Sequence, residues 1–84
     1  MNDQEILGLL KEALAEVAPA RAADFDSITL EATIEDLDLD SVSTMEMVGF
    51  LEERVDVIFP DEELARVSRL GDLAALIRGE RVSA

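Results

Sequence analysis

Apolar residues recur at three- and four-residue intervals near the start of the chain. These positions are Ile6, Leu10, Ala13, Leu14 and Val17. Charged residues lie between them, so the pattern predicts an amphipathic helix. Asn2 or Asp3 is suited to cap its start, and Pro19 marks its end.

The next segment, from about residue 20 to residue 40, shows neither helical nor strand periodicity. Its large apolar residues are Phe25, Ile28, Leu30, Ile34 and Leu37. Loops of this length in compact domains are usually functional or held down by their own side chains. We expect a long loop that these five residues pin to the core.

A second helix is predicted from Ser41 to about Val55. Asp40 can cap it, and Ser43 with Glu46 has the spacing of a capping box if the helix starts slightly later. One apolar stripe runs along this helix, at Met47, Leu51 and Val55. We expect this stripe to face the interior of the protein.

Two more helices are predicted after an extended connection over residues 57–60. Pro60 suits the first turn of a short helix over residues 61–67. Ser68 is expected to cap a last helix, which Gly79 ends. The apolar positions of that helix are Leu70, Leu73, Leu76 and Ile77. The expected fold is a single all-α domain over residues 1–84, a four-helix bundle with three main helices, one short helix and a long first loop.

Composition narrows the possible functions. Hydrophobic residues make up 49% of the chain, which argues against disorder, and no apolar run approaches the roughly 18 residues of a membrane span. The absence of cysteine and histidine removes disulfides, thiol nucleophiles and Cys/His zinc sites. The acidic N-terminus lacks the basic start of a signal peptide, so we expect a cytoplasmic protein. We also expect a monomer.

The net charge of −13 argues against binding nucleic acid or anionic membrane. The charge is also uneven, because residues 31–63 hold twelve acidic residues and one base, Arg54. Such a run is often only a solvated face. Here the acids surround one predicted helix and the loop that enters it, so a docking surface for basic partners is an equal interpretation.

Asp36, Asp38 and Asp40 match the opening of an EF-hand calcium loop. That loop needs glycine at its sixth position and a bidentate glutamate at its twelfth. This chain has Ser41 and Met47 there. We therefore expect no calcium-sensor loop and no dedicated metal site in this segment; weak, adventitious binding of a divalent cation to these carboxylates stays open.

Ser41 lies where the long loop meets the second helix. A serine at a helix start is usually only a cap, but a helix N-terminus also favours an attached phosphodiester. No histidine and no close lysine is available to activate the hydroxyl. Ser41 is therefore a poor catalytic nucleophile and a good substrate for another enzyme.

The segment Ile34–Val55, IEDLDLDSVSTMEMVGFLEERV, resembles the signature of acyl carrier proteins. The later segments VIFPDEE, from Val57, and SRLGDL, from Ser68, resemble the same family in the same order. The resemblance extends over nearly the whole chain. It implies that a phosphopantetheinyl transferase attaches 4′-phosphopantetheine from coenzyme A to Ser41. The thiol of that arm would then carry an acyl group as a thioester, and the protein itself would catalyse nothing.

The resemblance also implies roles for other residues. Acidic positions that match those docking on basic patches of partner enzymes are Asp40, Glu46, Glu53 and Asp61. Apolar positions that match partner contacts are Val42, Met45 and Phe59. The stripe of Met47, Leu51 and Val55 would line the interior where the family shelters acyl chains, although ordinary core packing explains it equally well. The partners implied are acyltransferases, ketosynthases and other synthase or tailoring enzymes.

The sequence departs from the family pattern at Asp38, where the family usually has glycine, and at Gly49, where the family has a bulky apolar residue.

We expect a free-standing acyl carrier protein of fatty acid or polyketide synthesis. The alternatives are a peptidyl or aminoacyl carrier of a nonribosomal-peptide-type pathway, and an acidic interaction module that is never modified.

Overall fold

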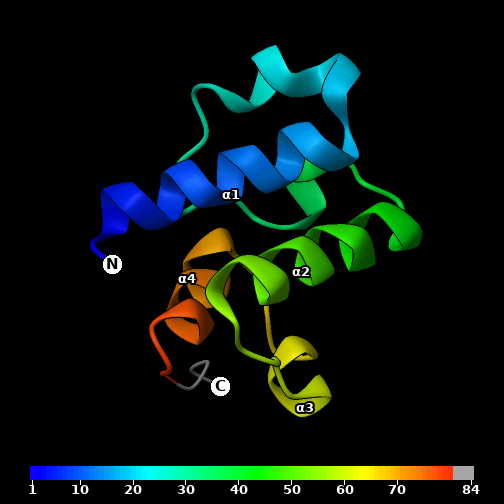
Figure 1. Cartoon of the computed structure of the whole chain (residues 1–84). Coiled ribbons are helices and arrows are strands. Elements are labelled where there is room, and N and C mark those ends of the chain that lie inside the picture. Colours follow the sequence, from blue (N-terminus) through cyan, green and yellow to red (C-terminus); the bar gives the residue numbers. More distant parts are fainter. Residues whose placement is uncertain (81–84) are drawn as a thin grey trace.

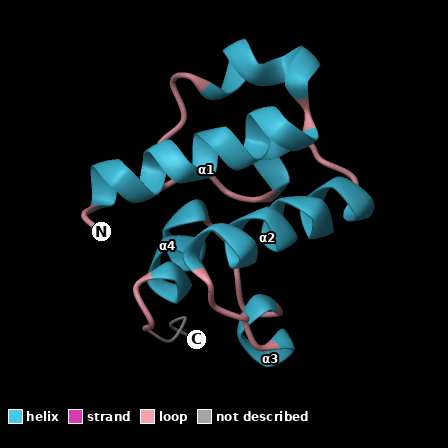
Figure 2. Cartoon of the chain, in the orientation of Figure 1, coloured by secondary structure: helices cyan, strands magenta, loops and turns pink. Residues whose placement is uncertain are grey.

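A computed structural model describes residues 1–80 of the chain. Within that range the elements are helices and 3₁₀ turns, and no strand is formed (Figures 1 and 2). They are α1 (Asp3–Val17), η1 (Pro19–Phe25), η2 (Glu35–Leu37), α2 (Ser41–Val55), α3 (Asp61–Leu64) and α4 (Leu70–Ile77). The all-α acyl-carrier-like fold is confirmed. The expected single domain of residues 1–84 stays a prediction, and its last four residues lie outside the described range.

Helix α1 is the centre of the molecule. It contacts η1, α2 and α4, and Figure 1 shows it between η1 and α2. Its start is fixed by Asn2, whose side chain accepts the Glu5 N–H at 2.8 Å, while the Glu5 carboxylate accepts the Asn2 N–H at 2.9 Å. This capping box satisfies two of the N–H groups that a helix start leaves unpaired. The buried face is Ile6, Leu9, Leu10, Ala13 and Leu14.

The long loop contains two 3₁₀ turns that the sequence did not indicate. Short i→i+3 turns leave no apolar stripe, so periodicity cannot detect them. Phe25 and Leu37 are buried, and Ile28, Leu30 and Ile34 pack against the core, as expected. The loop is therefore held by its own apolar side chains.

Backbone hydrogen bonds also tie the loop to the start of α4. The Gly71 N–H donates to the Leu30 carbonyl at 2.7 Å, and the Leu70 N–H donates to the Ala32 carbonyl at 2.9 Å. The Ile34 N–H donates to the Ser68 carbonyl, also at 2.9 Å. The segment that leads into α2 is thus hydrogen-bonded to the residues at the start of α4.

Helix α2 has the predicted bounds, Ser41–Val55. Asp40 is its N-cap, and its carboxylate accepts the Ser43 N–H at 2.7 Å. The helix ends where Asp56 adopts a left-handed conformation with φ of 56°. Met47 and Leu51 are fully buried, whereas Val55 is half-buried.

Two details of the last helices differ from expectation. Helix α3 ends at Leu64 instead of residue 67, because the following turn switches to i→i+3 hydrogen bonds, including Val67 N–H to the Leu64 carbonyl. Ser68 does not cap α4. The Asp72 carboxylate instead accepts the N–H groups of Ser68 and Arg69, at 2.9 and 3.0 Å.

The predicted end of α4 is confirmed. Gly79 has a φ of +82°, and its N–H donates to the Leu76 carbonyl at 3.0 Å. The Glu80 N–H reaches back to the Ala75 carbonyl at 2.8 Å. This pair of bonds is a Schellman motif, which needs a residue that tolerates the left-handed conformation.

Gly49 gives a test of the helix energetics. It is exposed on α2, and a Cβ added there would meet nothing within 4 Å. Because glycine costs a helix interior about 1 kcal/mol relative to alanine, Gly49→Ala should raise the free energy of unfolding in urea by up to that amount. Gly71→Ala is the control, since its Cβ would lie 3.2 Å from the Leu30 carbonyl oxygen and should bring no gain. Destabilisation by Gly49→Ala would contradict this view of an open helix face.

Candidate attachment site and docking surface

Ser41 is the first residue of α2 and is exposed to solvent. Because Asp40 takes the capping position, the Ser41 hydroxyl is not needed to satisfy the helix start. Among residues 1–80 the Ser41 side chain makes no hydrogen bond. The simple interpretation of Ser41 as a helix cap is therefore wrong, and its hydroxyl is accessible to a modifying enzyme.

The pKa of the neighbouring Asp40 carboxyl is lowered. The main cause is the hydrogen bond from the Ser43 N–H, followed by the bond with the Ser43 hydroxyl. A weaker bond from the Val42 N–H acts in the same direction, and desolvation opposes it. Hydrogen bonds to the charged form favour that form, so Asp40 serves as an ionised cap directly before Ser41.

The chain reaches Ser41 through a left-handed turn. Asp38 has φ of 52° and ψ of 44°, a conformation that aspartate tolerates better than most residues. Arg21 donates from Nη1 to the Asp38 carbonyl at 3.2 Å, and its guanidinium lies 5.2 Å from the centre of the Phe25 ring. Arg21 thus connects η1 to the turn that leads into α2.

The three aspartates that resemble a calcium loop do not form one. The Asp40 carboxylate holds the start of α2, and the Asp36 carboxylate accepts the Thr33 N–H at 3.4 Å. In the described part of the chain, no group of three or more acidic side chains is placed to hold a metal ion.

Most of the residues expected to dock on partners are on the surface. Asp40, Glu46, Glu53 and Asp61 are exposed, as are Val42 and Met45 at 67% and 74%. The exception is Phe59, which is 3% exposed and belongs to the core. The expectation that Phe59 contacts partners is corrected, because its neighbour Ile58 is the exposed residue, at 84%.

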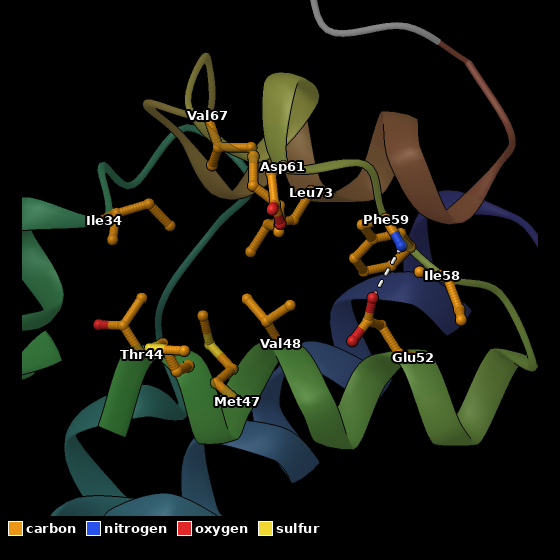
Figure 3. Close-up of a pocket in the computed structure, with 12 residues that line it drawn as sticks. Ile34, Thr44, Met47, Val48, Glu52, Ile58, Phe59, Asp61, Val67 and Leu73 are labelled. Atoms are coloured by element: carbon orange, nitrogen blue, oxygen red, sulfur yellow. Dashed lines mark hydrogen bonds between the residues drawn. The ribbon is translucent and has the colours of Figure 1, made fainter. Parts of the chain in front are cut away.

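The extended segment between α2 and α3 explains why Ile58 is exposed and Phe59 is buried. Successive side chains of an extended backbone point in opposite directions, so when Phe59 packs inward Ile58 faces outward. Phe59 belongs to the core cluster, and the Glu52 carboxylate accepts its backbone N–H at 2.8 Å (Figure 3). The alternation was visible in the sequence, but nothing there showed which of the two residues is buried.

A cavity of about 610 Å³ lies between α2, the extended segment, α3 and α4. Its lining is Ile34, Thr44, Met45, Met47, Val48, Glu52, Ile58, Phe59, Asp61, Leu64, Val67 and Leu73. Figure 3 shows Thr44, Met47, Val48 and Glu52 on α2, opposite Asp61 and Leu73.

Of the three residues expected to line an acyl pocket, only Met47 does so. Leu51 and Val55 are absent from the lining; Leu51 belongs to the buried core, and Val55 packs against it. The lining follows a neighbouring row, Thr44, Val48 and Glu52, at four-residue spacing. That row mixes polar and apolar residues, so apolar periodicity does not detect it.

The single base of the acidic segment is turned away from the exposed acids. Arg54 forms an ion pair with Glu12 of α1 at 3.0 Å, and its guanidinium lies 4.8 Å from the centre of the Phe50 ring. None of the ion pairs within residues 1–80 includes Glu46 or Glu53. The negative charge of the exposed α2 face is therefore not neutralised within the described structure.

The site does not contain the groups that a catalytic serine requires. The chain has no histidine, and its one lysine, Lys11, donates to the Asp26 carbonyl at 2.7 Å, far along the sequence from Ser41. The start of α2 suits a covalently attached phosphodiester, because helix N–H groups favour an anion. An exposed serine, a mostly apolar cavity and an acidic face are together the features expected of a small carrier domain.

The comparisons with known proteins agree with this class. The family described as "Phosphopantetheine attachment site" matches residues 8–77. The chain belongs to the acyl carrier protein family. Its cofactor is 4′-phosphopantetheine, whose thiol holds an acyl group as a thioester. Members of this family are carriers and not enzymes, and they interact with synthases and transferases of fatty acid or polyketide-type biosynthesis.

Several relatives cover most of the chain. An acyl carrier protein of Exiguobacterium sp. is 36% identical over 78 residues, which is 92% of this chain and 95% of the relative. An acyl carrier protein of Acidothermus cellulolyticus is 34% identical over 84 residues, covering 100% and 98%. A meromycolate extension acyl carrier protein of Mycolicibacterium aurum is 35% identical, covering 92% and 77%. No solved structure matches the chain.

Across residues 1–80, none of the helices has both the length and the apolar character needed to cross a membrane.

Proposed function

We propose that Ser41 is the residue that carries 4′-phosphopantetheine. The supporting observation is at the start of α2. Asp40 caps the helix, and the exposed Ser41 hydroxyl has no hydrogen-bond partner among the described residues. In the modification, Ser41 Oγ forms the new bond to phosphorus and the nucleotide half of coenzyme A leaves. A base on the transferase takes the hydroxyl proton.

The test is loading with coenzyme A and a phosphopantetheinyl transferase of broad specificity, followed by intact mass measurement. The wild-type protein should gain one phosphopantetheine, and Ser41→Ala should gain none. Ser43→Ala is the control, because it removes the nearest other serine while Asp40 still caps the helix through the Ser43 N–H. An unmodified wild-type protein would contradict the proposal.

We further propose that the exposed face of α2 and the adjoining loop dock on partner enzymes with basic patches. This docking face consists of Asp40, Val42, Met45, Glu46, Glu53, Ile58 and Asp61. Three large apolar side chains exposed among acids favour a binding surface over a merely solvated one. Its partners would be the phosphopantetheinyl transferase, acyltransferases, ketosynthases and tailoring enzymes. Cytoplasmic location and a monomeric state stay predictions.

The cavity beside α2 is the proposed shelter for the acyl chain. Its lining is mostly apolar, and burying each methylene of a chain there is worth about 0.8 kcal/mol. Some relatives are named for meromycolate extension, and that function is theirs. For this chain we propose acyl cargo of fatty acid or polyketide synthesis in preference to an aminoacyl group, because an alkyl chain buries more apolar surface against this mostly apolar lining than an aminoacyl group does.

A further inference from the structure

Three of the side chains that line the cavity beside α2 have hydrogen-bonding oxygen atoms, those of Thr44, Glu52 and Asp61. The other lining side chains are aliphatic, aromatic or thioether groups. Any hydrogen bond between a bound chain and the side chains of this lining must therefore involve these three residues.

Thr44 can only accept a further hydrogen bond. Its Oγ1 donates to the Asp40 carbonyl at 2.9 Å, so its one proton is already used. The remaining lone pairs of the hydroxyl can still accept a hydrogen bond. Thr44 lies about one helical turn after Ser41 on α2, so it is the first of the three residues along the helix from the proposed attachment point.

The other two residues are acceptors as well. A carboxylate offers only lone pairs, so Glu52 and Asp61 cannot donate. The Glu52 carboxylate already takes the Phe59 N–H at 2.8 Å, which removes that backbone donor from the cavity. In Figure 3 the Glu52 and Asp61 side chains approach the cavity from opposite walls.

We propose that this cavity selects acyl chains that carry hydroxyl groups over chains that carry keto groups, and that it rejects anionic cargo such as a malonyl group. A hydroxyl can donate to the acceptors of the lining. A keto oxygen would leave water without finding a side-chain donor, which is unfavourable. A cargo carboxylate would be repelled by Glu52 and Asp61. This inference rests on the proposed function, because it requires Ser41 to be loaded and the chain to enter the cavity.

The experiment loads the protein through Ser41 with octanoyl, 3-hydroxyoctanoyl, 3-oxooctanoyl, malonyl and β-alanyl phosphopantetheine from the corresponding coenzyme A thioesters. Intact mass confirms each loading. The rate of thioester hydrolysis is then measured. The protection factor is the hydrolysis rate of the same thioester on free pantetheine divided by its hydrolysis rate on the protein. One net hydrogen bond corresponds to about fivefold, so the 3-hydroxyoctanoyl form should be protected about fivefold more than the 3-oxooctanoyl form. The malonyl form should show no protection, and the β-alanyl form, which has no long alkyl chain to bury, should be protected less than the octanoyl form.

Thr44→Val keeps the shape of the side chain and removes one of the three acceptors, so the preference for the hydroxyl should decrease while octanoyl protection remains. Ser43→Ala is the matched control, because it removes a hydroxyl of α2 that does not line the cavity. NMR shifts of the Met47 and Val48 methyl groups, which line the cavity, should follow the same order in the wild-type protein.

Three results would overturn the inference and leave Ser41 as the carrier residue. They are equal protection of the hydroxy and keto forms, a preference that Thr44→Val does not reduce, and greatest protection of the β-alanyl form. Absence of octanoyl protection on a loaded protein would show that the cavity is not used, and would also overturn it. A protein that cannot be loaded at all would overturn the proposed function together with this inference.

Discussion

Phe59→Ala is expected to lower the free energy of unfolding by about 3–5 kcal/mol, while Ile58→Ala should change it by less than about 0.5 kcal/mol. The two residues are adjacent, but Phe59 is 3% exposed and packs in the core, whereas Ile58 is 84% exposed. The Phe59 N–H bond to Glu52 uses the backbone and survives the substitution, so the loss measures side-chain packing. Urea denaturation of both variants beside the wild-type protein makes the comparison.

The expected loss is large for a small domain, because the whole stability of such a domain is only about 5–15 kcal/mol. Phe59→Leu is a useful intermediate, since it keeps much of the buried volume and should recover a good part of the loss. Similar losses for Phe59→Ala and Ile58→Ala would contradict the assignment of one residue to the core and the other to the docking face.

Reversing two charges of the docking face should have the second large effect. The double variant Glu46→Lys/Glu53→Lys is expected to lower kcat/KM for transferase loading by at least about tenfold at low salt, because it removes the steering that speeds encounter with a basic surface. The difference should shrink near 1 M salt, where the Debye length is only about 3 Å.

The control for this variant is Glu16→Lys/Asp26→Lys, which changes the net charge equally at exposed positions outside the docking face. It should slow loading much less. Equal slowing by both double variants would show that only the net charge matters. No slowing by either would show that the acids serve solubility alone.

The helix bounds were predictable where sequence signals are local. Helices α1 and α2 follow apolar periodicity, and their caps at Asn2 and Asp40 are residue types that a helix start favours. Gly79 similarly marked the end of α4. In each case the signal and the structure lie within a few residues of each other, so no tertiary contact is needed to predict the outcome.

The remaining features depend on contacts between distant segments. The end of α3, the burial of Phe59 in place of Ile58 and the use of Asp72 at the start of α4 are decided by packing and hydrogen bonds that local periodicity does not contain. The cavity lining was missed for a related reason. Apolar periodicity identifies the row of α2 that faces the core, at Leu51, and the cavity lies beside the next row, at Val48.

The measurement that tests the central claim most directly is the location of the phosphopantetheine on the loaded protein. The wild-type chain is incubated with coenzyme A and the transferase, digested, and fragmented by tandem mass spectrometry. The modification should be found on Ser41, the hydroxyl that Asp40 leaves free at the start of α2. Its location on Ser43 or on any other residue, or a chain that stays unmodified, would contradict the account.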